Sequence, residues 1–364
     1  MTRRFLGSGS LKGRGALSNP PVRFESTSVE RTDDGWQTEE EPTTSLPQIV
    51  LPDRARSVIT TNDSPDVGFE QSINPYRGCS HGCVYCFARP SHAYLGLSPG
   101  LDFETRLFYK DNAVELLRAE LGRRGYRCKP IALGINTDGW QPLEREMKVS
   151  RSVLAVLAEC RHPVTIVTKS TLILRDLDLL QDLAREQLVS VMVSVTSLDA
   201  AMKRTLEPRA AAPLARLKVV EQLAAAGVPV GVLIAPVIPA LTDHELEHIM
   251  EAAKAAGASS AGYVLLRLPH EVKDLFREWL AEHYPDRASH VMSVINQSRG
   301  GRDYRAEFHT RMVGTGVFAQ LLRARFDVAA RKFALKDAHG RHELRTDLFR
   351  PPAAPGDAQL SLGL

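Results

Sequence analysis

The sequence contains 364 residues, of which 43% are hydrophobic and 24% are charged, and its formal net charge is +3 at pH 7. This composition is typical of a globular protein with a large core, and so small a net charge does not by itself indicate a nucleic-acid-binding protein. No run of about 18 apolar residues occurs, and the basic N-terminus lacks the apolar stretch of a signal peptide, so we expect a cytoplasmic protein without a membrane span.

Two polar segments border the predicted domain. Residues 1–55 are rich in Gly, Pro, Ser and Thr without helical or strand periodicity, so we expect an extended, partly disordered arm, part of which could dock on the domain. Residues 346–364 are predicted to form a disordered tail. Between these segments we expect one α/β domain over residues 56–290 and a helical C-terminal section over residues 291–345.

Within the domain, six strand-like segments alternate with six helix-like segments. The strands are expected within residues 69–73, 129–136, 163–169, 188–196, 228–238 and 261–268, and the helices within residues 111–125, 150–161, 175–187, 213–227, 242–257 and 270–284. Apolar strands joined by helices favour a parallel sheet with right-handed crossovers. The result is a closed or partial barrel or a doubly wound sheet, and both place chemistry at the carboxyl ends of the strands.

Three of the five cysteines, Cys79, Cys83 and Cys86, lie together directly after the first expected strand. Cysteine thiolates bind soft or borderline metals, and so compact a group in a reducing compartment indicates a metal site rather than disulfides. A structural zinc site usually needs four ligands. No second cysteine pair follows, although His81 or His92 could supply the fourth ligand.

A [4Fe–4S] cluster is the alternative occupant of this loop. Such a cluster normally has four cysteine ligands, so a set of three leaves one iron open to a small molecule. Gly78 and Gly82 precede two of the cysteines and would let the loop wrap tightly.

Polar residues follow the next three strands, where a binding pocket on one rim of the sheet would need them. A cationic side chain such as Lys169 can pair with a ligand carboxylate, and Arg209 is a second candidate for that role. Simpler interpretations remain open: a solvated surface charge for the two cations, a backbone-capping hydroxyl for the Ser and Thr residues, and a helix-start cap for Glu144, which could otherwise act as an acid or base. The candidates at these strand ends are Thr137, Asp138, Lys169, Ser194, Thr196, Glu207 and Arg209.

The C-x3-C-x2-C spacing, with Tyr85 before the last cysteine and ahead of a series of β–α units, resembles the radical S-adenosylmethionine (radical SAM) superfamily. The segments "SINPYRGC", "NTDGWQPLE" and "LEPRA", with "GRGALSNP" in the arm, further resemble its spore photoproduct lyase, or DNA-repair photolyase-like, branch. The resemblance implies a partial (β/α)6 barrel. It also implies a [4Fe–4S] cluster on the three cysteines, S-adenosylmethionine (SAM) on the open iron, and reductive cleavage of SAM to a 5′-deoxyadenosyl radical.

The same resemblance implies roles for single residues and for a partner. Thr137, Lys169 and Ser194 match positions that contact SAM in the photolyase-like branch, and Asp138 lies beside them. Tyr85 is expected to cover the cluster and the adenine. The electron would come from a donor such as a flavodoxin or ferredoxin.

The chain departs from the photolyase pattern at two positions. Ile135 occupies the place of the hydrogen-donating cysteine of spore photoproduct lyase, and Phe87 occupies that of an assisting tyrosine. Thymine-dimer reversal is therefore not expected, and the substrate is left open. One alternative is a radical SAM enzyme acting on a DNA lesion or an RNA base; another is a non-enzymatic binding module stabilised by metal.

Overall fold

The computed structural model describes residues 3–4, 11–24, 46–337 and 344–353. Its main feature is an eight-stranded sheet in the order β13-β12-β11-β10-β9-β8-β5-β4. The six central strands are the six predicted ones; they pair in parallel and follow the order of the chain. Their bounds are β5 (Gln71–Ile73), β8 (Ile131–Leu133), β9 (Val164–Thr168), β10 (Val189–Ser194), β11 (Val230–Val237) and β12 (Ser260–Leu265).

Two short strands border this parallel set. β4 (Ile59–Thr61) pairs antiparallel with β5, and β13 (Lys336–Asp337) pairs in parallel with β12. The two border strands do not pair with each other, so among the described residues the sheet stays open, as in a partial barrel. The predicted α/β fold is therefore confirmed, and β13 is a strand within a section that was expected to be helical.

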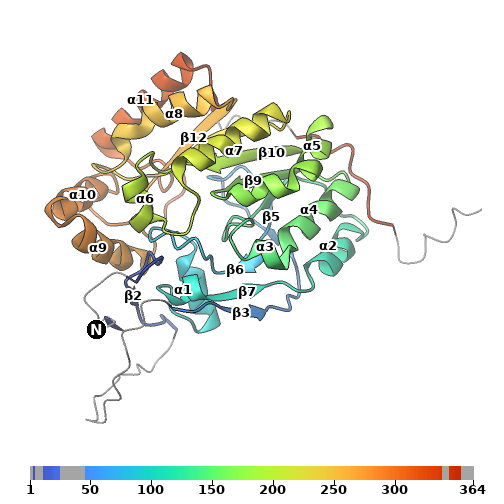
Figure 1. The fold of residues 1–364 in the computed structure, drawn as a ribbon, viewed down its shortest axis with the longest axis horizontal. Coiled ribbons are helices and arrows are strands. Elements are labelled where there is room, and N and C mark those ends of the chain that lie inside the picture. The colour runs from blue at the N-terminus through green and yellow to red at the C-terminus, as the bar shows by residue number, and fades with distance from the viewer. Residues whose placement is uncertain (1–2, 5–10, 25–45, 338–343, 354–364) are drawn as a thin grey trace, which may run out of the picture.

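Helices follow the strands and pack against the sheet and against one another (Figure 1). α2 contacts α4, α4 contacts α5, α7 lies on β10 and β11, and α11 lies beside α8. The longer helices are α2 (Ala113–Leu121), α4 (Val149–Glu159), α5 (Leu177–Arg185), α6 (Ala200–Leu206), α7 (Pro213–Ala225), α8 (Leu246–Ala255), α9 (Val272–His283), α10 (Pro285–Gln297) and α11 (Gly316–Lys332). The shorter ones are η1 (Arg89–Leu95), α1 (Asp102–Thr105), α3 (Glu144–Met147), η2 (Thr171–Asp176) and η3 (Asp243–Glu245).

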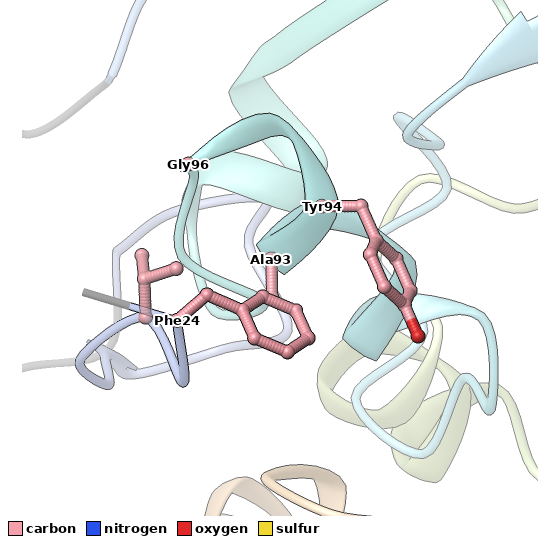
Figure 2. A pocket seen from close by; sticks show the side chains of 5 residues that line it. Phe24, Ala93, Tyr94 and Gly96 are labelled. Carbon is pink, nitrogen blue, oxygen red and sulfur yellow. The ribbon is translucent and has the colours of Figure 1, made fainter.

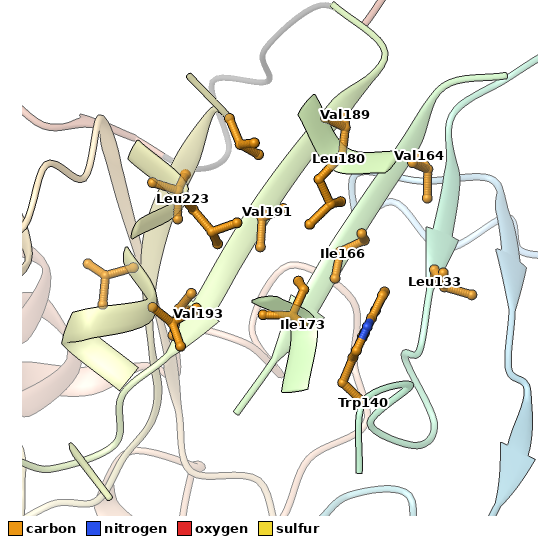
Figure 3. Close-up of a cluster of buried hydrophobic side chains, with 14 of the residues drawn as sticks. Leu133, Trp140, Val164, Ile166, Ile173, Leu180, Val189, Val191, Val193 and Leu223 are labelled. Carbon is orange, nitrogen blue, oxygen red and sulfur yellow. The ribbon is translucent and has the colours of Figure 1, made fainter. Parts of the chain in front are cut away.

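The core lies between the sheet and these helices (Figure 3). Branched side chains of the strands, such as Val164, Ile166 and Val191, are fully buried against Leu180 and Leu223 of the helices. Each such side chain stabilises the fold by about 1.5–3 kcal/mol. This packing explains why the near-continuous apolar runs predicted the strands correctly.

A second sheet joins the arm to the cysteine region. β3 (Ile49–Pro52) pairs in parallel with β7 (Arg106–Tyr109), and β7 pairs antiparallel with β6 (Tyr76–Arg77). In the arm, β1 (Arg3–Arg4) pairs with β2 (Ser18–Asn19). None of the helices in the described parts of the chain has the length and apolar character needed to cross a membrane.

The structure corrects the expectation of a disordered tail for residues 346–353. The backbone N–H of Arg350 donates to the carbonyl oxygen of Cys160 at 2.9 Å. The Phe349 ring lies 5.4 Å from that of Tyr126 and 5.3 Å from that of His162, between ring centroids. Aromatic packing holds this segment against the domain, although it contains two consecutive prolines. The rest of the predicted tail, residues 354–364, lies outside the described residues.

Candidate functional site

The cysteine loop follows β5 and lies at the carboxyl edge of the parallel sheet. Its three cysteines have free thiols; Cys79 and Cys83 are buried and Cys86 is half-buried. Gly82 has a φ of +70°, and a Cβ added there would lie 2.8 Å from Oε2 of Glu104. Only glycine suits that position, because it accepts the left-handed conformation and leaves room for the neighbour.

The donor chemistry of this loop fits an iron–sulfur cluster. Burial raises the pKa of all three thiols, that of Cys79 to about 12, and the thiols of Cys79 and Cys86 further raise that of Cys83. Thiols this close together and this buried become thiolates readily only beside a strong positive charge, which iron supplies. In the same loop, the buried hydroxyl of Ser80 has no hydrogen-bond partner. Within the described ranges, no group of three or more His, Cys, Asp or Glu side chains could hold a single metal ion.

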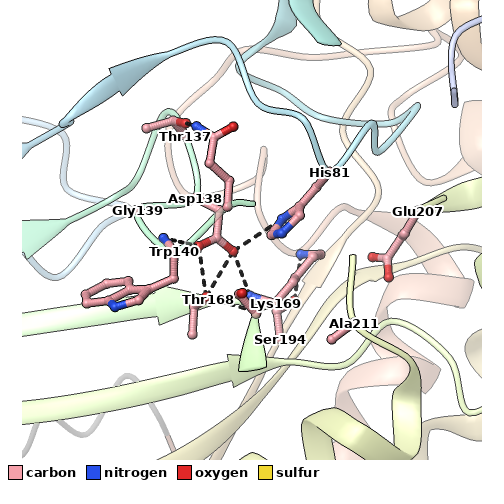
Figure 4. Close-up of polar contacts among 12 residues, drawn as sticks. His81, Thr137, Asp138, Gly139, Trp140, Thr168, Lys169, Ser194, Glu207 and Ala211 are labelled. Carbon is pink, nitrogen blue, oxygen red and sulfur yellow. Dashed lines mark hydrogen bonds and ion pairs between the residues drawn. The ribbon is translucent and has the colours of Figure 1, made fainter. Parts of the chain in front are cut away.

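Asp138, after β8, connects two strand ends with the cysteine loop (Figure 4). Its carboxylate accepts hydrogen bonds from the hydroxyl of Thr168 at 2.8 Å and the backbone N–H of Lys169 at 2.7 Å. Nδ1 of His81 lies 3.4 Å from the same carboxylate. Burial lowers the pKa of His81 to about 4, so the imidazole is neutral at pH 7 and the contact is not an ion pair.

Lys169 lies at the end of β9 and points along the rim of the sheet (Figure 4). Its ammonium donates a hydrogen bond of 2.8 Å to the hydroxyl of Ser194, the last residue of β10. The same Nζ lies 5.9 Å from the centroid of the Tyr85 ring. Three of the predicted site residues are thus brought together beside the cysteine loop, with a cation at their centre.

Behind Tyr85 lies a buried network built on Glu207. The carboxylate of Glu207 accepts hydrogen bonds from the hydroxyls of Tyr85 and Thr196 and from the guanidinium of Arg216. Burial would raise the pKa of Glu207, but the charges of Arg216 and Lys169 outweigh this effect and hold it at about 2. The carboxylate therefore stays ionised at neutral pH and fixes the phenol of Tyr85.

Three other predicted residues are placed differently. The buried hydroxyl of Thr137 donates to the carbonyl oxygen of Gly78 at 2.8 Å, so it ties β8 to the cysteine loop. Arg209 has an exposed side chain, and its backbone N–H donates to the carbonyl oxygen of His81 at 3.1 Å. Glu144 is the first residue of α3 and is fully buried; it pairs with Arg175 and accepts from the backbone N–H groups of Ser150 and Arg151 at the start of α4, which favours a structural role over that of an acid or base.

Sequence reasoning missed two residues that shape the site. Gln141 accepts the backbone N–H of Ser80 at 2.8 Å, and Arg216 pairs with Glu207 and donates to the carbonyl oxygen of Ser194 at 3.0 Å. Arg216 lies within the helical pattern of α7, so nothing in the sequence distinguished it from a surface charge. Gln141 lies within the motif "NTDGWQPLE", and this position was the feature of the sequence that could have identified it as a site residue.

An aromatic and cationic surface adjoins the cysteine loop on the β12 side. Phe87, which directly follows Cys86, is 41% exposed, and the guanidinium carbon of Arg267 lies 5.3 Å from its ring centroid. The same carbon lies 6.0 Å from the Tyr304 ring. Among the described residues no carboxylate pairs with Arg267, and its buried Nε has no hydrogen-bond partner. We call Phe87, Arg267 and Tyr304 the cationic rim.

A surface pocket of about 390 Å³ lies elsewhere, between the arm and η1 (Figure 2). Val22, Phe24, Ala93, Tyr94 and Gly96 line it, and the rings of Phe24 and Tyr94 lie 5.1 Å apart between centroids. The phenol of Tyr94 is its only titratable side chain. We therefore assign the chemistry to the carboxyl edge of the sheet, where the thiols and charged groups gather.

Comparison with known proteins places the chain among its relatives. The family model described as "Radical SAM superfamily" matches residues 73–253. The uncharacterized protein Rv2578c of Mycobacterium tuberculosis is 40% identical over 231 residues, which cover 63% of this chain and 68% of that protein. The uncharacterized protein MJ0683 of Methanocaldococcus jannaschii is 25% identical over 219 residues, which cover 60% of this chain and 78% of that protein.

Solved structures show the same fold. Spore photoproduct lyase complexed with dinucleoside spore photoproduct superposes with a TM-score of 0.57 at 16% identity, covering 79% of this chain and 81% of that one. A variant of that lyase with bound AdoMet and the dinucleoside gives a TM-score of 0.56 at 15% identity, covering 79% and 80%.

Proposed function

This chain belongs to the radical SAM superfamily and is a radical SAM enzyme, and we propose that Cys79, Cys83 and Cys86 hold a [4Fe–4S] cluster at which SAM is cleaved. When bound, the cluster would supply the electron that breaks the sulfonium bond and yields a 5′-deoxyadenosyl radical. One observation carries the proposal: the loop with these three thiols meets the polar ends of β8, β9 and β10 at one edge of a parallel sheet.

Lys169 and Ser194 are proposed to hold the methionine end of SAM. Among the described residues, the hydrogen-bond acceptor of the Lys169 ammonium is the neutral hydroxyl of Ser194, which leaves further N–H groups for the SAM carboxylate. Asp138 fixes the backbone of Lys169 through its N–H. Asp138 is thereby a positioning residue for the cation, with its carboxylate also available to the SAM amine.

Tyr85 is proposed to cover the cluster and the adenine. Its phenol is held by Thr196 and Glu207, so the ring cannot swing away without leaving a buried carboxylate short of a donor. Such a loss is costly in a buried network. Thr137 and Gln141 would keep the loop carrying the thiols against β8.

Arg209 remains a second candidate for the SAM carboxylate. Its backbone is held beside the loop through His81, while its exposed side chain is free to turn toward a ligand. The electron donor is proposed to be a flavodoxin or ferredoxin. Free buried thiols suit a reducing compartment, in keeping with a cytoplasmic enzyme.

The test is anaerobic reconstitution with iron and sulfide. We expect about four irons per chain and the broad visible absorption of an iron–sulfur cluster, followed by release of 5′-deoxyadenosine from SAM on reduction. Protein that takes up no iron, or reconstituted protein that leaves SAM intact under a strong reductant, would contradict the proposal. Membership of an enzyme superfamily already argues against a purely structural metal site.

A second candidate concerns the substrate, and the cationic rim favours it. The Arg267 guanidinium donates to the hydroxyl of Tyr304 at 3.3 Å but has no carboxylate partner among the described residues. A guanidinium between two aromatic rings suits an anionic ligand with flat groups, such as a nucleotide or a nucleic-acid strand. Spore photoproduct lyase, which has a similar fold, is described in complex with dinucleoside spore photoproduct. Phe87 and Ile135 lack the hydrogen-donating groups of that lyase, so we propose a different reaction on such a substrate. Salt-dependent binding of a single-stranded oligonucleotide would support this candidate, and binding that ignores salt would oppose it.

A further inference from the structure

We infer that residues 11–19 of the N-terminal arm form one wall of the cysteine loop and determine how firmly the loop retains its cluster. The inference rests on the proposed iron–sulfur chemistry and extends it to a segment outside residues 73–253, which the family model matches. It assigns Gly15, Glu104 and Arg89 as positioning residues.

Glu104, in α1, anchors the arm. Its carboxylate accepts the backbone N–H of Gly15 at 3.1 Å and that of Ala16 at 2.9 Å. In return, the side chain of Arg14 donates to the carbonyl oxygen of Glu104 at 3.2 Å. The side chain of Glu104 is fully buried, so these charge-assisted bonds are shielded from water and hold the arm in one position.

Arg89 connects this anchor to a cluster ligand. Its fully buried guanidinium pairs with the carboxylate of Glu104 at 2.5 Å, and its Nε donates to the carbonyl oxygen of Cys83 at 2.9 Å. Another N–H of Arg89 donates to the carbonyl oxygen of Gly100 at 2.8 Å. A shift of the arm would therefore move Glu104, then Arg89, and then the backbone that carries the Cys83 thiol.

The arm also touches the loop directly. A Cβ added at Gly15 would lie 1.8 Å from the carbonyl oxygen of Gly82 and 3.2 Å from the backbone nitrogen of Val84. Gly15 does not have a positive φ, so close approach rather than backbone conformation requires glycine there. Ala16 is fully buried in the apolar cluster that contains Cys83, Val84 and Tyr85.

These contacts bear on the cluster because solvent access and the hydrogen bonds around the cysteines control its properties. The arm covers one side of the loop at Gly82 and Cys83, and the Glu104–Arg89 pair fixes a carbonyl of a ligand residue. Loosening the arm should expose the cluster while leaving the parallel sheet intact. Loosening the arm should therefore shorten the lifetime of the cluster without a matching loss in the stability of the apoprotein.

The experiment uses four full-length variants, reconstituted anaerobically. Gly15→Ala forces the arm off the loop, and Glu104→Gln removes the charge that anchors it. Lys12→Ala is the control within the arm, since Lys12 is exposed. Glu120→Gln is the matched carboxylate control: Glu120 is also buried and accepts the successive backbone N–H groups of Val58 and Ile59 at 2.9 and 3.0 Å.

Two rates are measured: iron transfer to a chelator without oxygen, and bleaching of the visible absorption in air. We expect both to rise about tenfold or more in Gly15→Ala and Glu104→Gln, with Lys12→Ala and Glu120→Gln at the wild-type rates. The thermal unfolding midpoint of each apoprotein is recorded alongside. We expect Glu104→Gln to lower it more than Glu120→Gln, because the buried Arg89 guanidinium loses its counter-charge. Gly15→Ala keeps that ion pair, so it is the variant in which faster cluster loss should occur without a comparable loss of stability.

Wild-type rates in Gly15→Ala would overturn the inference and leave the proposed function standing. Equal acceleration in Glu104→Gln and Glu120→Gln would overturn it too, because the effect would then follow general stability. Wild-type protein that takes up no iron would overturn the proposed function and this inference together.

Discussion

Lys169 and Ser194 meet across the ends of two adjacent parallel strands, with 2.8 Å between Nζ and Oγ. This bond places the ammonium beside Tyr85 and the cysteine loop, although 25 residues separate its partners in the chain. Because a hydroxyl is a weaker acceptor than a carboxylate, the Lys169 ammonium can bind a ligand carboxylate more strongly than it binds Ser194.

Lys169→Met should weaken SAM binding by about 2 kcal/mol, or roughly thirtyfold, because a hydrogen bond to a charged group is lost. Titration calorimetry on anaerobically reconstituted protein measures it. Ser194→Ala, which spares the charge, should cost much less. Equal losses in the two variants would contradict the proposal that the ammonium is the main group holding the SAM carboxylate.

Replacing Cys79, Cys83 or Cys86 singly by alanine should abolish cluster retention and SAM cleavage together. Each thiol is one of three proposed ligands, and a cluster with two protein ligands is poorly held. Iron analysis and 5′-deoxyadenosine release are the measurements. Cys128→Ala and Cys160→Ala should retain both properties, since Cys160 lies at the end of α4 and Cys128 precedes the amino end of β8. Loss of iron in the Cys160 variant would refute the ligand assignment.

Glu207→Gln should destabilise the apoprotein by about 3 kcal/mol, because it leaves the buried Arg216 guanidinium without its counter-charge. The double variant Glu207→Gln/Arg216→Met should recover part of that loss. Urea denaturation measures both. Asp182→Asn breaks an exposed pair with Arg185 and should change stability by at most about 0.5 kcal/mol. An effect of Glu207→Gln as small as this control would argue against a tight network behind Tyr85.

His162 should make stability depend on pH. Burial lowers its pKa from 6.5 to about 4, so the unfolded chain binds the proton that the folded protein excludes. The stability that this neutral histidine provides should therefore be fully present above about pH 6.5 and be lost as the pH drops toward 4. By about pH 4.5 the free energy of unfolding should have fallen by about 2 kcal/mol through this residue. Denaturation of wild type and His162→Gln at both ends of this window provides the comparison. Parallel pH profiles for the two proteins would rule out the contribution.

Arg267→Ala should weaken binding of a single-stranded oligonucleotide and lower the slope of log affinity against log salt by about 1. The reason is that its guanidinium lies beside Phe87 and Tyr304 and has no carboxylate partner among the described residues. Fluorescence anisotropy at several salt concentrations measures the slope. Arg302→Ala removes an exposed charge five residues before Glu307 and serves as the control. If both variants weaken oligonucleotide binding equally, the cationic rim is not the binding site and the effect comes from net charge alone.

Much of the fold was predictable because the strands carry their own signal. Apolar runs such as residues 188–196 become β10, and the sheet pairs these runs in the order in which they occur. The tail at residues 346–353 was not predictable, because its packing depends on Tyr126 and His162, which are distant in the chain. Local periodicity reports only on contacts that repeat along one segment.

The candidate site divides in the same way. Cys79, Cys83 and Cys86 could be grouped from the sequence, since one short loop carries all three, and their spacing pointed to the radical SAM superfamily. Other contacts of the site could not be predicted from the sequence, because each joins groups from separate segments. They are the contacts of Lys169 with Ser194, of Glu207 with Arg216, and of Gly15 with Gly82. The sequence determined the order of the strands and the grouping of the three thiols on one loop. The tertiary structure alone decided which charges are buried, which partners they have and what covers the loop, because those depend on distances through space and on the exclusion of water.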